Sequence, residues 1–300
     1  MRSRDIVDLL LLAMLWGGSF LFMRLAVPEF GPLPLVEMRV LVAALFLLPL
    51  MLRHHRADVL SRNWRGLAFI GITNSAIPFA LFSFAMLSIT SGFAAILNST
   101  SPLFAGVIAW IWLRDRLPWM RAAGLLVGFA GVALLVWGKP TFSLRGDALA
   151  IAAAIGASLS YGFSPNFIKR HMTQVPPIVI ATGSQVVAAI VVLPMAIAQW
   201  PATTPSTIAW LSAVAIGVGC TGIAYILYFR LIRNVGPTRA IAVTFLIPGF
   251  GMLYGALFLG EPVTAGMIAG CAVILAGTAL ATGVIDARPF ARRTVDRATK

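Results

Sequence analysis

The chain has 300 residues, of which 59% are apolar and 11% are charged, whereas a soluble globular domain has about 45–50% apolar and about 25% charged residues. This composition excludes a water-soluble fold and leaves no room for a soluble catalytic domain. Since about 20 apolar residues cross a bilayer once, the apolar residues suffice for about ten crossings. The net charge of +13 would indicate nucleic-acid binding in a soluble protein, but in a membrane protein it is first compared with the positive-inside rule.

Ten apolar segments, separated by charged or Pro- and Gly-rich breaks, predict transmembrane helices. In chain order we expect them at residues 8–26, 34–52, 66–88, 92–113, 119–138, 147–168, 177–199, 208–230, 238–259 and 264–284. The first apolar stretch continues to Val27 without a cleavage site of small residues, so we interpret it as a retained helix rather than a signal peptide. Cys220 and Cys271 lie in apolar segments without a CxxC spacing and indicate neither a disulfide nor a metal site, and no cofactor is expected.

The distribution of positive charge predicts the orientation. With the N-terminus in the cytoplasm, 19 of the 23 Lys and Arg residues fall in cytoplasmic segments, and only Lys139 and Arg145 fall in outer loops. This asymmetry predicts that both termini are cytoplasmic. Because the charge is spread over every inner loop, it indicates contact with membrane lipids rather than with nucleic acid. We therefore expect a multi-pass protein of the bacterial inner (plasma) membrane.

A shift of 146 residues aligns the sequence with itself. The aligned pairs are Pro102 and Pro248, Asp115 and Glu261, Gly124 and Gly270, Gly131 and Gly277, Phe79 and Tyr225, and Arg39 and Gln185. The shift divides the chain into two five-helix repeats, residues 1–140 and 141–285, and a basic cytoplasmic tail at 286–300. Since five is odd, the second repeat is inverted, as in many secondary transporters. We predict an all-α integral membrane protein of ten helices, whose halves open a central site to each side in turn.

Several motifs resemble those of EamA-type carriers of the drug/metabolite transporter superfamily. They are Trp16-Gly17-Gly18-Ser19-Phe20, the segment from Ala94 through Pro102-Leu103-Phe104 to Arg116, its second-half counterpart ending in Leu259-Gly260-Glu261-Pro262, and the glycine-rich fifth and tenth helices. The resemblance covers both halves, and length and layout are similar to the YddG-type amino-acid exporters. It implies export of aromatic and other neutral amino acids, with another metabolite or drug as the alternative cargo. The chain departs from the family at Asp115, where a glutamate is usual.

Four prolines inside predicted helices free the carbonyl group four residues earlier, which in a membrane needs a partner or a cavity. The pairs of proline and freed carbonyl are Pro78 and Asn74, Pro102 and Asn98, Pro165 and Tyr161, and Pro248 and Thr244. Pro102 and Pro248 are equivalent in the two repeats, so they predict discontinuous helices beside a central site. A simple kink, with polar neighbours that satisfy the backbone, is the alternative.

The candidate substrate-binding residues combine these positions with aromatic side chains, because aromatic faces and a few polar groups suit a small zwitterion. They are Trp16, Phe20, Asn74, Pro78, Asn98, Pro102, Tyr161, Tyr225, Thr244 and Pro248. The expected hinge positions are Gly17, Gly18 and Pro165. The polar run Asn98–Ser101 is expected either to face a cavity or to join helices.

Apart from charged residues at the span boundaries, which we count with the loops, three ionisable residues fall inside the predicted spans: Arg24, Glu37 and Arg39. We expect them near the outer ends of the first two helices, where snorkelling or an ion pair of Glu37 with an arginine explains them. No acidic residue at mid-depth could relay protons, so movement down the substrate gradient is the simplest mechanism. An anionic cargo would need a cation at mid-depth, and none is expected there.

Other classes of function are less well supported by the sequence. All three histidines fall in predicted cytoplasmic loops, so an intramembrane enzyme lacks the residues for nucleophilic or metal catalysis. A passive channel is a remote alternative. The glycines of the fifth and tenth helices predict that these helices join the two halves within a functional monomer.

Overall fold

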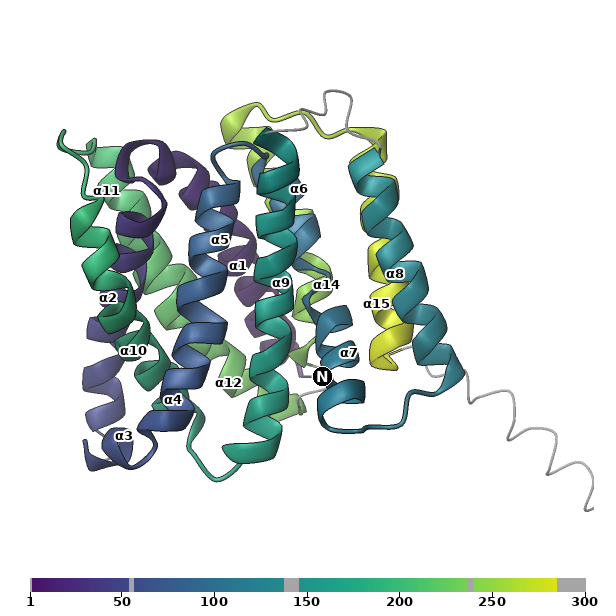
Figure 1. The fold of residues 1–300 in the computed structure, drawn as a ribbon, viewed down its shortest axis with the longest axis horizontal. Helices are drawn as coiled ribbons and strands as arrows, with labels where there is room; N and C mark the ends of the chain where they lie inside the picture. The colour runs from purple at the N-terminus through teal and green to yellow at the C-terminus, as the bar shows by residue number, and fades with distance from the viewer. Residues whose placement is uncertain (1, 54–56, 138–145, 237–239, 285–300) are drawn as a thin grey trace, which may run out of the picture.

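In the computed structural model, which describes residues 2–53, 57–137, 146–236 and 240–284, the chain folds into a bundle of long helices (Figure 1). The elements of the first half are α1 Ser3–Phe30, α2 Pro32–Leu52, α3 Asp58–Arg62, α4 Trp64–Gly71, η1 Ile72–Ala76, α5 Ile77–Ala85, α6 Ser91–Asn98, α7 Ser101–Trp112 and α8 Trp119–Trp137. Those of the second half are α9 Gly146–His171, α10 Pro177–Ala198, α11 Thr207–Val214, η2 Ala215–Ile223, α12 Ala224–Val235, α14 Val243–Leu259 and α15 Ala265–Thr282.

These helices confirm the predicted fold class. Nine spans in the described residues are long and apolar enough to cross a membrane, and the tenth, α14, has 17 residues. Three spans are composite: α4, η1 and α5 form one, α6 and α7 another, and α11, η2 and α12 the third. Helix α1 begins at Ser3 rather than at residue 8, so Asp5 and Asp8 lie inside it. The expected basic tail, 286–300, lies outside the described residues.

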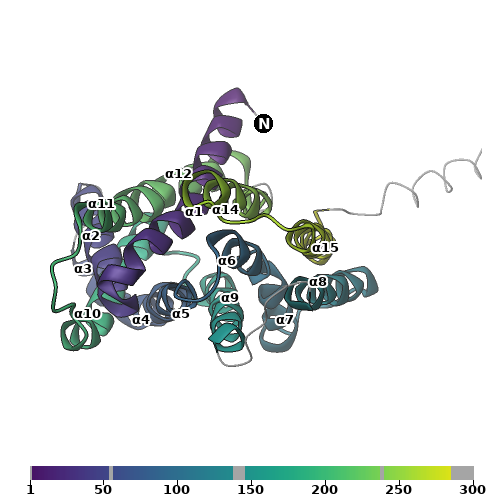
Figure 2. The same ribbon diagram turned by 90° about the horizontal axis from the view of Figure 1, so that it is seen from above.

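The two halves pack with the same set of contacts. Helix α2 packs against α10 and α8 against α15, and these helices are the equivalent spans of the two repeats. Helix α1 packs against η2 and α12 of the second half, as α9 packs against η1 and α5 of the first. This exchange of partners is the packing expected for inverted repeats. Seen from above, the α8–α15 pair lies at one edge of the bundle (Figure 2).

Glycines bring α8 and α15 into backbone contact. A Cβ atom on Gly124 would lie 2.4 Å from the backbone nitrogen of Ala281, and one on Gly277 would lie 2.2 Å from that of Gly128. Because no larger residue fits at these positions, the glycine spacing is what allows the close approach. The prediction that the fifth and tenth helices join the halves is confirmed.

Each repeat contains a π-helical segment in its third span. Segments η1 and η2 occupy equivalent positions in the two repeats, in the middle of composite spans. In η1 the backbone N–H of Ile77 bonds the carbonyl of Ile72, and Pro78 follows in the first turn of α5. In η2 the Thr221 hydroxyl donates to the Ile216 carbonyl, 2.9 Å away. π-Helical turns in membrane and soluble helices are frequent at functional sites.

The two ends of the bundle differ in the elements they carry. At one end lie the start of α1, helix α3, and the C-terminal ends of α7, α9 and α12 (Figure 1). We call it the basic end, since the described arginines and lysine near these elements are Arg2, Arg4, Arg53, Arg62, Arg65, Arg114, Arg116, Arg121, Lys169, Arg170, Arg230 and Arg233. The C-terminal ends of α1, α5, α10 and α14 lie at the opposite end (Figure 1).

Candidate functional site

Two hydrogen bonds connect the halves at the π-helical segments. Arg39 of α2 donates from Nε to Thr221 Oγ1 of η2 at 3.1 Å. Gln185 of α10 donates from Nε2 to Ser75 Oγ of η1 at 2.9 Å. The two donors are 146 residues apart, and so are the two acceptors. The second contact is therefore the inverted-repeat counterpart of the first.

A third hydrogen bond lies beside these two. Asn74 Nδ2 donates to the hydroxyl of Tyr225 at 3.0 Å and so joins η1 to α12. We call the six residues of these three contacts the central layer: Arg39, Asn74, Ser75, Gln185, Thr221 and Tyr225. The layer draws on the second and third spans of both repeats.

Equivalent glycines bring the donor helices close to the π-helical spans. A Cβ atom on Gly217 would lie 2.7 Å from Val42 Cβ and 3.1 Å from the carbonyl oxygen of Arg39. A Cβ atom on Gly71 would lie 2.8 Å from the carbonyl oxygen of Ser184. Gly71 and Gly217 are also 146 residues apart. These contacts place Arg39 and Gln185 beside the hydroxyl groups that they bond.

Arg39 lies deeper in the bundle than the sequence predicts. It is only 8% exposed and bonds Thr221, which lies in the middle of the span Thr207–Val235. Its guanidinium carbon lies 3.5 Å from the centroid of the Phe79 ring. The expectation that Arg39 snorkels to the outer surface is therefore wrong. Arg39 lies close to the start of α2, but its contacts with η2 and Phe79 hold its side chain inside the bundle.

The surroundings of Arg39 offset the free-energy cost of its position. An arginine at the centre of a membrane helix costs about 2.5–3.5 kcal/mol on insertion scales. A desolvated cation–π contact contributes about 2 kcal/mol, and a hydrogen bond to a charged group contributes about 1.5–3 kcal/mol. The Phe79 and Thr221 contacts are therefore sufficient to keep a charged guanidinium at this depth.

Glu37 lies in α2, two residues before Arg39, and is also buried, at 4% exposure. Its Oε2 atom has no hydrogen-bond partner, and no ion pair joins it to a described Lys or Arg. The expected ion pair of Glu37 with an arginine is absent from the described residues. Arg24 does form an ion pair, but with Glu261.

Aromatic rings connect the central layer to α1. Tyr161 of α9 lies beside Phe79 and Phe82, with ring centroids 6.4 and 6.2 Å away. Phe82 meets Phe20 edge to face, with centroids 5.5 Å apart. Four of the predicted site residues, Phe20, Asn74, Tyr161 and Tyr225, are thus linked by contacts with the central layer or with its aromatic neighbours. Pro78 is buried at the start of α5, next to η1.

Trp16 is the fourth aromatic candidate. Its ring packs against that of Tyr228 in α12, with centroids 5.3 Å apart. Tyr228 follows Tyr225 on the same helix by one turn. Trp16 therefore lies beside the α12 face that also presents Tyr225.

The predicted break at Pro102 is confirmed. Helix α6 ends at Asn98 and α7 begins at Ser101. The hydroxyls of Ser99, Thr100 and Ser101 donate to the carbonyls of Ile96, Leu97 and Asn98 at 2.6, 2.6 and 2.7 Å. These hydroxyls therefore satisfy the backbone around the break, and the carbonyl of Asn98 that Pro102 frees is among those that accept.

At the equivalent proline the predicted break is wrong. Helix α14 runs from Val243 to Leu259 without interruption past the buried Pro248. A turn at 241–242 precedes the helix, and the Thr244 hydroxyl donates to the Ile241 carbonyl at 2.7 Å. The irregular backbone thus lies before α14, because a membrane helix tolerates a proline where other groups satisfy the freed carbonyl. Among the described contacts, neither Asn98 nor Thr244 hydrogen-bonds to the central layer.

The three expected hinge positions lie in different surroundings. A Cβ atom on Gly17 would lie 2.6 Å from Phe250 Cβ, so this glycine lets α1 pack against α14. Gly18 is buried and faces Tyr254, whose ring would be 3.5 Å from an added Cβ. Pro165 is exposed within the continuous helix α9. Their role as hinges stays a prediction.

A charged cluster closes the opposite end. Glu261 accepts hydrogen bonds from the backbone nitrogen of Ser91 at 2.9 and 3.0 Å and from its hydroxyl at 2.6 Å. Arg24 Nε lies 3.8 Å from Glu261 Oε1, and Arg24 also donates to the Met86 carbonyl. A Cβ atom on Gly255 would lie 2.3 Å from Glu261 Oε2, so the glycine makes room for the carboxylate. The side chain of Glu261 is only 11% exposed.

A related cluster lies at the basic end and is more open. Lys169 pairs with Asp115 at 2.9 Å, and Arg170 donates to the Trp112 carbonyl at 3.4 Å. Asp115 is equivalent to Glu261, and Arg170 to Arg24, by the offset of 146 residues. The side chain of Asp115 is 45% exposed, four times as much as that of Glu261. We call these groups the basic-end cluster and the opposite-end cluster.

The charged residues near the start of α1 join it to α12. Asp8 pairs with Arg230 at 2.5 Å, and Asn234 donates to Asp5 at 3.1 Å. Asp8 and Asp5 are 3% and 5% exposed. The expected first helix, 8–26, includes Asp8 but begins too late to include Asp5.

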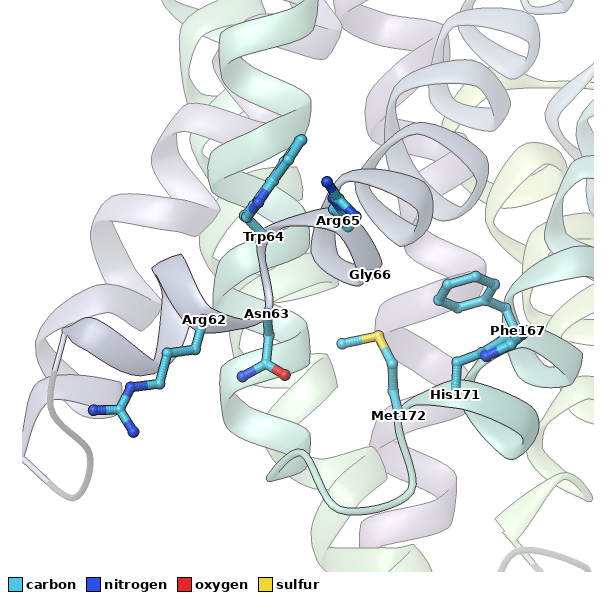
Figure 3. A pocket seen from close by; sticks show the side chains of 8 residues that line it. All are labelled: Arg62, Asn63, Trp64, Arg65, Gly66, Phe167, His171 and Met172. Atoms are coloured by element: carbon cyan, nitrogen blue, oxygen red, sulfur yellow. The ribbon is translucent and has the colours of Figure 1, made fainter.

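A cavity of about 500 Å³ opens at the basic end between α4 and the end of α9. Figure 3 shows the residues that line it, namely Arg62, Asn63, Trp64, Arg65, Gly66, Phe167, His171 and Met172. Arg62 extends away from Phe167 and His171 and pairs with Asp58 at 2.8 Å (Figure 3). None of the residues that line this cavity belongs to the central layer. We place the candidate site in the central layer, because that layer joins the two halves of the chain.

Sequence reasoning missed Ser75 and Thr221. Both are single hydroxyl residues in apolar helices and stand out little on their own. The signal was the repeat offset, which pairs the two residues with each other as it pairs Arg39 with Gln185.

Known proteins with similar sequences match most of the chain. The sequence profile of the EamA-like transporter family matches residues 6–137 and again residues 148–283. The chain is 22% identical over 286 residues to the uncharacterized transporter YvbV of Bacillus subtilis (strain 168), which covers 93% of this chain and 92% of that protein. It is 28% identical over 275 residues to the uncharacterized inner membrane transporter YedA of Escherichia coli (strain K12), covering 87% and 86%.

A solved crystal structure aligns with this chain with a TM-score of 0.66 and 20% sequence identity. The alignment covers 98% of this chain and 99% of the chain in that structure. At this identity the likeness concerns the fold alone.

Proposed function

The chain belongs to the EamA-like transporter family and is a multi-pass membrane transporter, and from this premise we propose that it exports aromatic and other neutral amino acids by alternating access. The proposed location is the bacterial inner membrane, with both termini in the cytoplasm, because positive charge is concentrated at the basic end. In this proposal the carrier acts as a monomer, with one five-helix repeat in residues 1–140 and the other in 141–285.

The observation that carries the mechanism is the unequal closure of two equivalent clusters. In the opposite-end cluster, Glu261 is enclosed by Ser91 and Arg24, whereas in the basic-end cluster Asp115 remains half exposed. Inverted repeats can exchange such arrangements, so that one end closes as the other opens. We propose that this structure is the state closed to the outside, and that the reverse movement closes the basic end.

The proposed substrate site lies at the central layer and its aromatic neighbours. Aromatic rings with a few polar groups suit a neutral amino acid with an apolar side chain. The buried Oε1 atom of Gln185 has no hydrogen-bond partner among the described residues and could accept from an ammonium group. The other predicted residues, Trp16, Asn98, Pro102, Thr244 and Pro248, are proposed to shape the path on either side.

Uptake of a panel of labelled amino acids into proteoliposomes tests this function. We expect saturable uptake of at least one neutral amino acid, and reduced uptake in Asn74→Ala and Trp16→Ala. Asn63→Ala is the matched control, since the Asn63 side chain donates to the Val59 carbonyl at the basic end and lies outside the central layer. A folded wild-type protein that takes up none of the amino acids would overturn the proposal. Full uptake in both Asn74→Ala and Trp16→Ala would overturn the placement of the site.

A further inference from the structure

Arg39 is a buried cation without an acidic partner. Among the described lysines and arginines it alone is buried, and no described Asp or Glu forms an ion pair with it. The titratable groups that act on it are the hydroxyls of Tyr161 and Tyr225 and the thiol of Cys220, all of them neutral in their ordinary state. An ionisable residue inside a membrane protein is by default a candidate for binding or transport.

Most of its hydrogen-bonding capacity is unused. A guanidinium has five N–H donors. Nε donates to Thr221, and Nη1 lies 3.9 Å from the sulfur of Met23, which is a weak acceptor. No other hydrogen bond of the guanidinium to described residues is present. The two Nη groups therefore keep the fork of donors that binds a carboxylate through both oxygens.

The contact between helices does not account for the charge. Gln185 makes the equivalent contact to Ser75 in the other repeat with a neutral side chain. A glutamine would therefore be sufficient to join α2 to η2, and it would avoid the cost of a buried charge. The arginine adds a positive charge to one half of an otherwise matched pair.

We propose that Arg39 binds the carboxylate of the transported molecule. The proposal rests on the proposed transport function and names the group that recognises one part of the substrate. Phe79 holds the guanidinium from one face, and Thr221 holds its Nε edge, so the Nη edge is left for the substrate. Asn74 of η1 and Tyr225 of α12, which share a hydrogen bond, belong to the same central layer as Arg39.

The test compares L-phenylalanine with L-phenylalaninamide, which keeps the ammonium group and the ring but has no carboxylate. Uptake of each compound into proteoliposomes is measured for wild type, Arg39→Gln, Arg39→Lys and the control Asn63→Ala. Arg39→Gln places in α2 the side chain that α10 already carries at the equivalent position, so the helix contact can be kept. Melting temperatures are measured for all four proteins to establish that they fold.

We expect wild type to prefer the carboxylate compound in kcat/KM by about 10- to 100-fold, as a charged hydrogen bond predicts. Arg39→Gln should abolish the preference and Arg39→Lys should keep part of it. Asn63→Ala, at the basic end and outside the central layer, should retain it. A folded Arg39→Gln protein that retains the full preference would overturn the role of Arg39 and leave amino-acid export standing.

A second measurement tests the role of Arg39 independently of the proposed transport of amino acids. Thermal stabilisation by other small carboxylates and by their amides is measured for wild type and Arg39→Gln. If wild type transports no amino acid but is stabilised by a carboxylate, and Arg39→Gln is not, the role of Arg39 is supported and the proposed function fails. If no amino acid is transported and no carboxylate stabilises wild type, both are overturned.

Discussion

Arg39 and Gln185, which lie 146 residues apart, each donate a hydrogen bond to a hydroxyl group in the π-helical segment of the other half of the chain. The two hydrogen bonds occupy equivalent positions in the two inverted repeats. They also show where the halves differ, because only one of the two donors is charged. That difference makes the central layer the part of the bundle in which to look for substrate recognition.

The close approach of α2 to η2 should depend on Gly217. Gly217→Ala places a Cβ atom 2.7 Å from Val42 Cβ, and overpacking of this kind costs about 1–3 kcal/mol. We expect a lower melting temperature in detergent. Gly219→Ala is the control, because its Cβ would meet nothing closer than 3.7 Å. Equal melting temperatures for the two variants would contradict the packing described for α2 and η2.

Asn74 and Tyr225 should act as one unit. Tyr225→Phe and Asn74→Ala each remove the same hydrogen bond, which contributes about 1 kcal/mol. Because this bond joins two sides of the proposed substrate site, we expect each variant to raise KM for the transported amino acid by up to about fivefold. We expect the double variant to differ from wild type by no more than the larger single effect, since residues in one hydrogen bond are not additive. Two effects that multiply would mean that the residues act separately.

Removal of the charge on Glu261 should open the opposite end. Glu261→Gln loses the ion pair with Arg24 and weakens the bonds from Ser91, each worth about 1.5–3 kcal/mol when one partner is charged. The readout is modification of a cysteine introduced at Asn98 by a membrane-impermeant thiol reagent, with Cys220 and Cys271 replaced by alanine. From the side of Glu261 we expect modification about tenfold faster.

Asp115→Asn, at the exposed basic-end cluster, is the matched control for Glu261→Gln. It should not increase the modification rate from the side of Glu261. Equal rates in the two variants would contradict the view that Glu261 closes that end.

The pair of Asp8 and Arg230 should stabilise the start of α1. Asp8→Asn leaves Arg230, which is 30% exposed, without its carboxylate partner. Because solvent reaches the arginine, we expect a moderate loss of about 1–3 kcal/mol, seen as a lower melting temperature. Adding Arg230→Gln should restore part of the stability, since the unpaired charge is then gone. A double variant less stable than Asp8→Asn would contradict this account.

Much of the fold could be predicted because its signals are long and repetitive. Apolar segments of about 20 residues indicate the spans, and one offset aligns Arg39 with Gln185 and Asp115 with Glu261 in the sequence alone. The break at Pro102 followed from the lost backbone donor. These inferences depend on the chemistry of neighbouring residues and on the internal repeat, and both can be identified in the sequence.

The depth and partners of single polar residues could not be predicted in the same way. Arg39 is central because Gly217 lets η2 approach α2, which is a contact between segments far apart in the chain. In the second repeat the irregular backbone is the turn at 241–242, which precedes α14, and the helix continues without a break past Pro248. Hydroxyls that looked available for a cavity, such as Thr100, instead satisfy the nearby backbone.

Counterflow in proteoliposomes tests alternating access of the central site most directly. Vesicles are loaded with an unlabelled neutral amino acid, diluted into a trace of the labelled compound, and compared with empty vesicles. A carrier that opens to one side at a time predicts saturable uptake and a transient accumulation of label above its outside concentration in the loaded vesicles. Uptake that rises linearly with concentration and is the same in loaded and empty vesicles would contradict the account and indicate a passive channel.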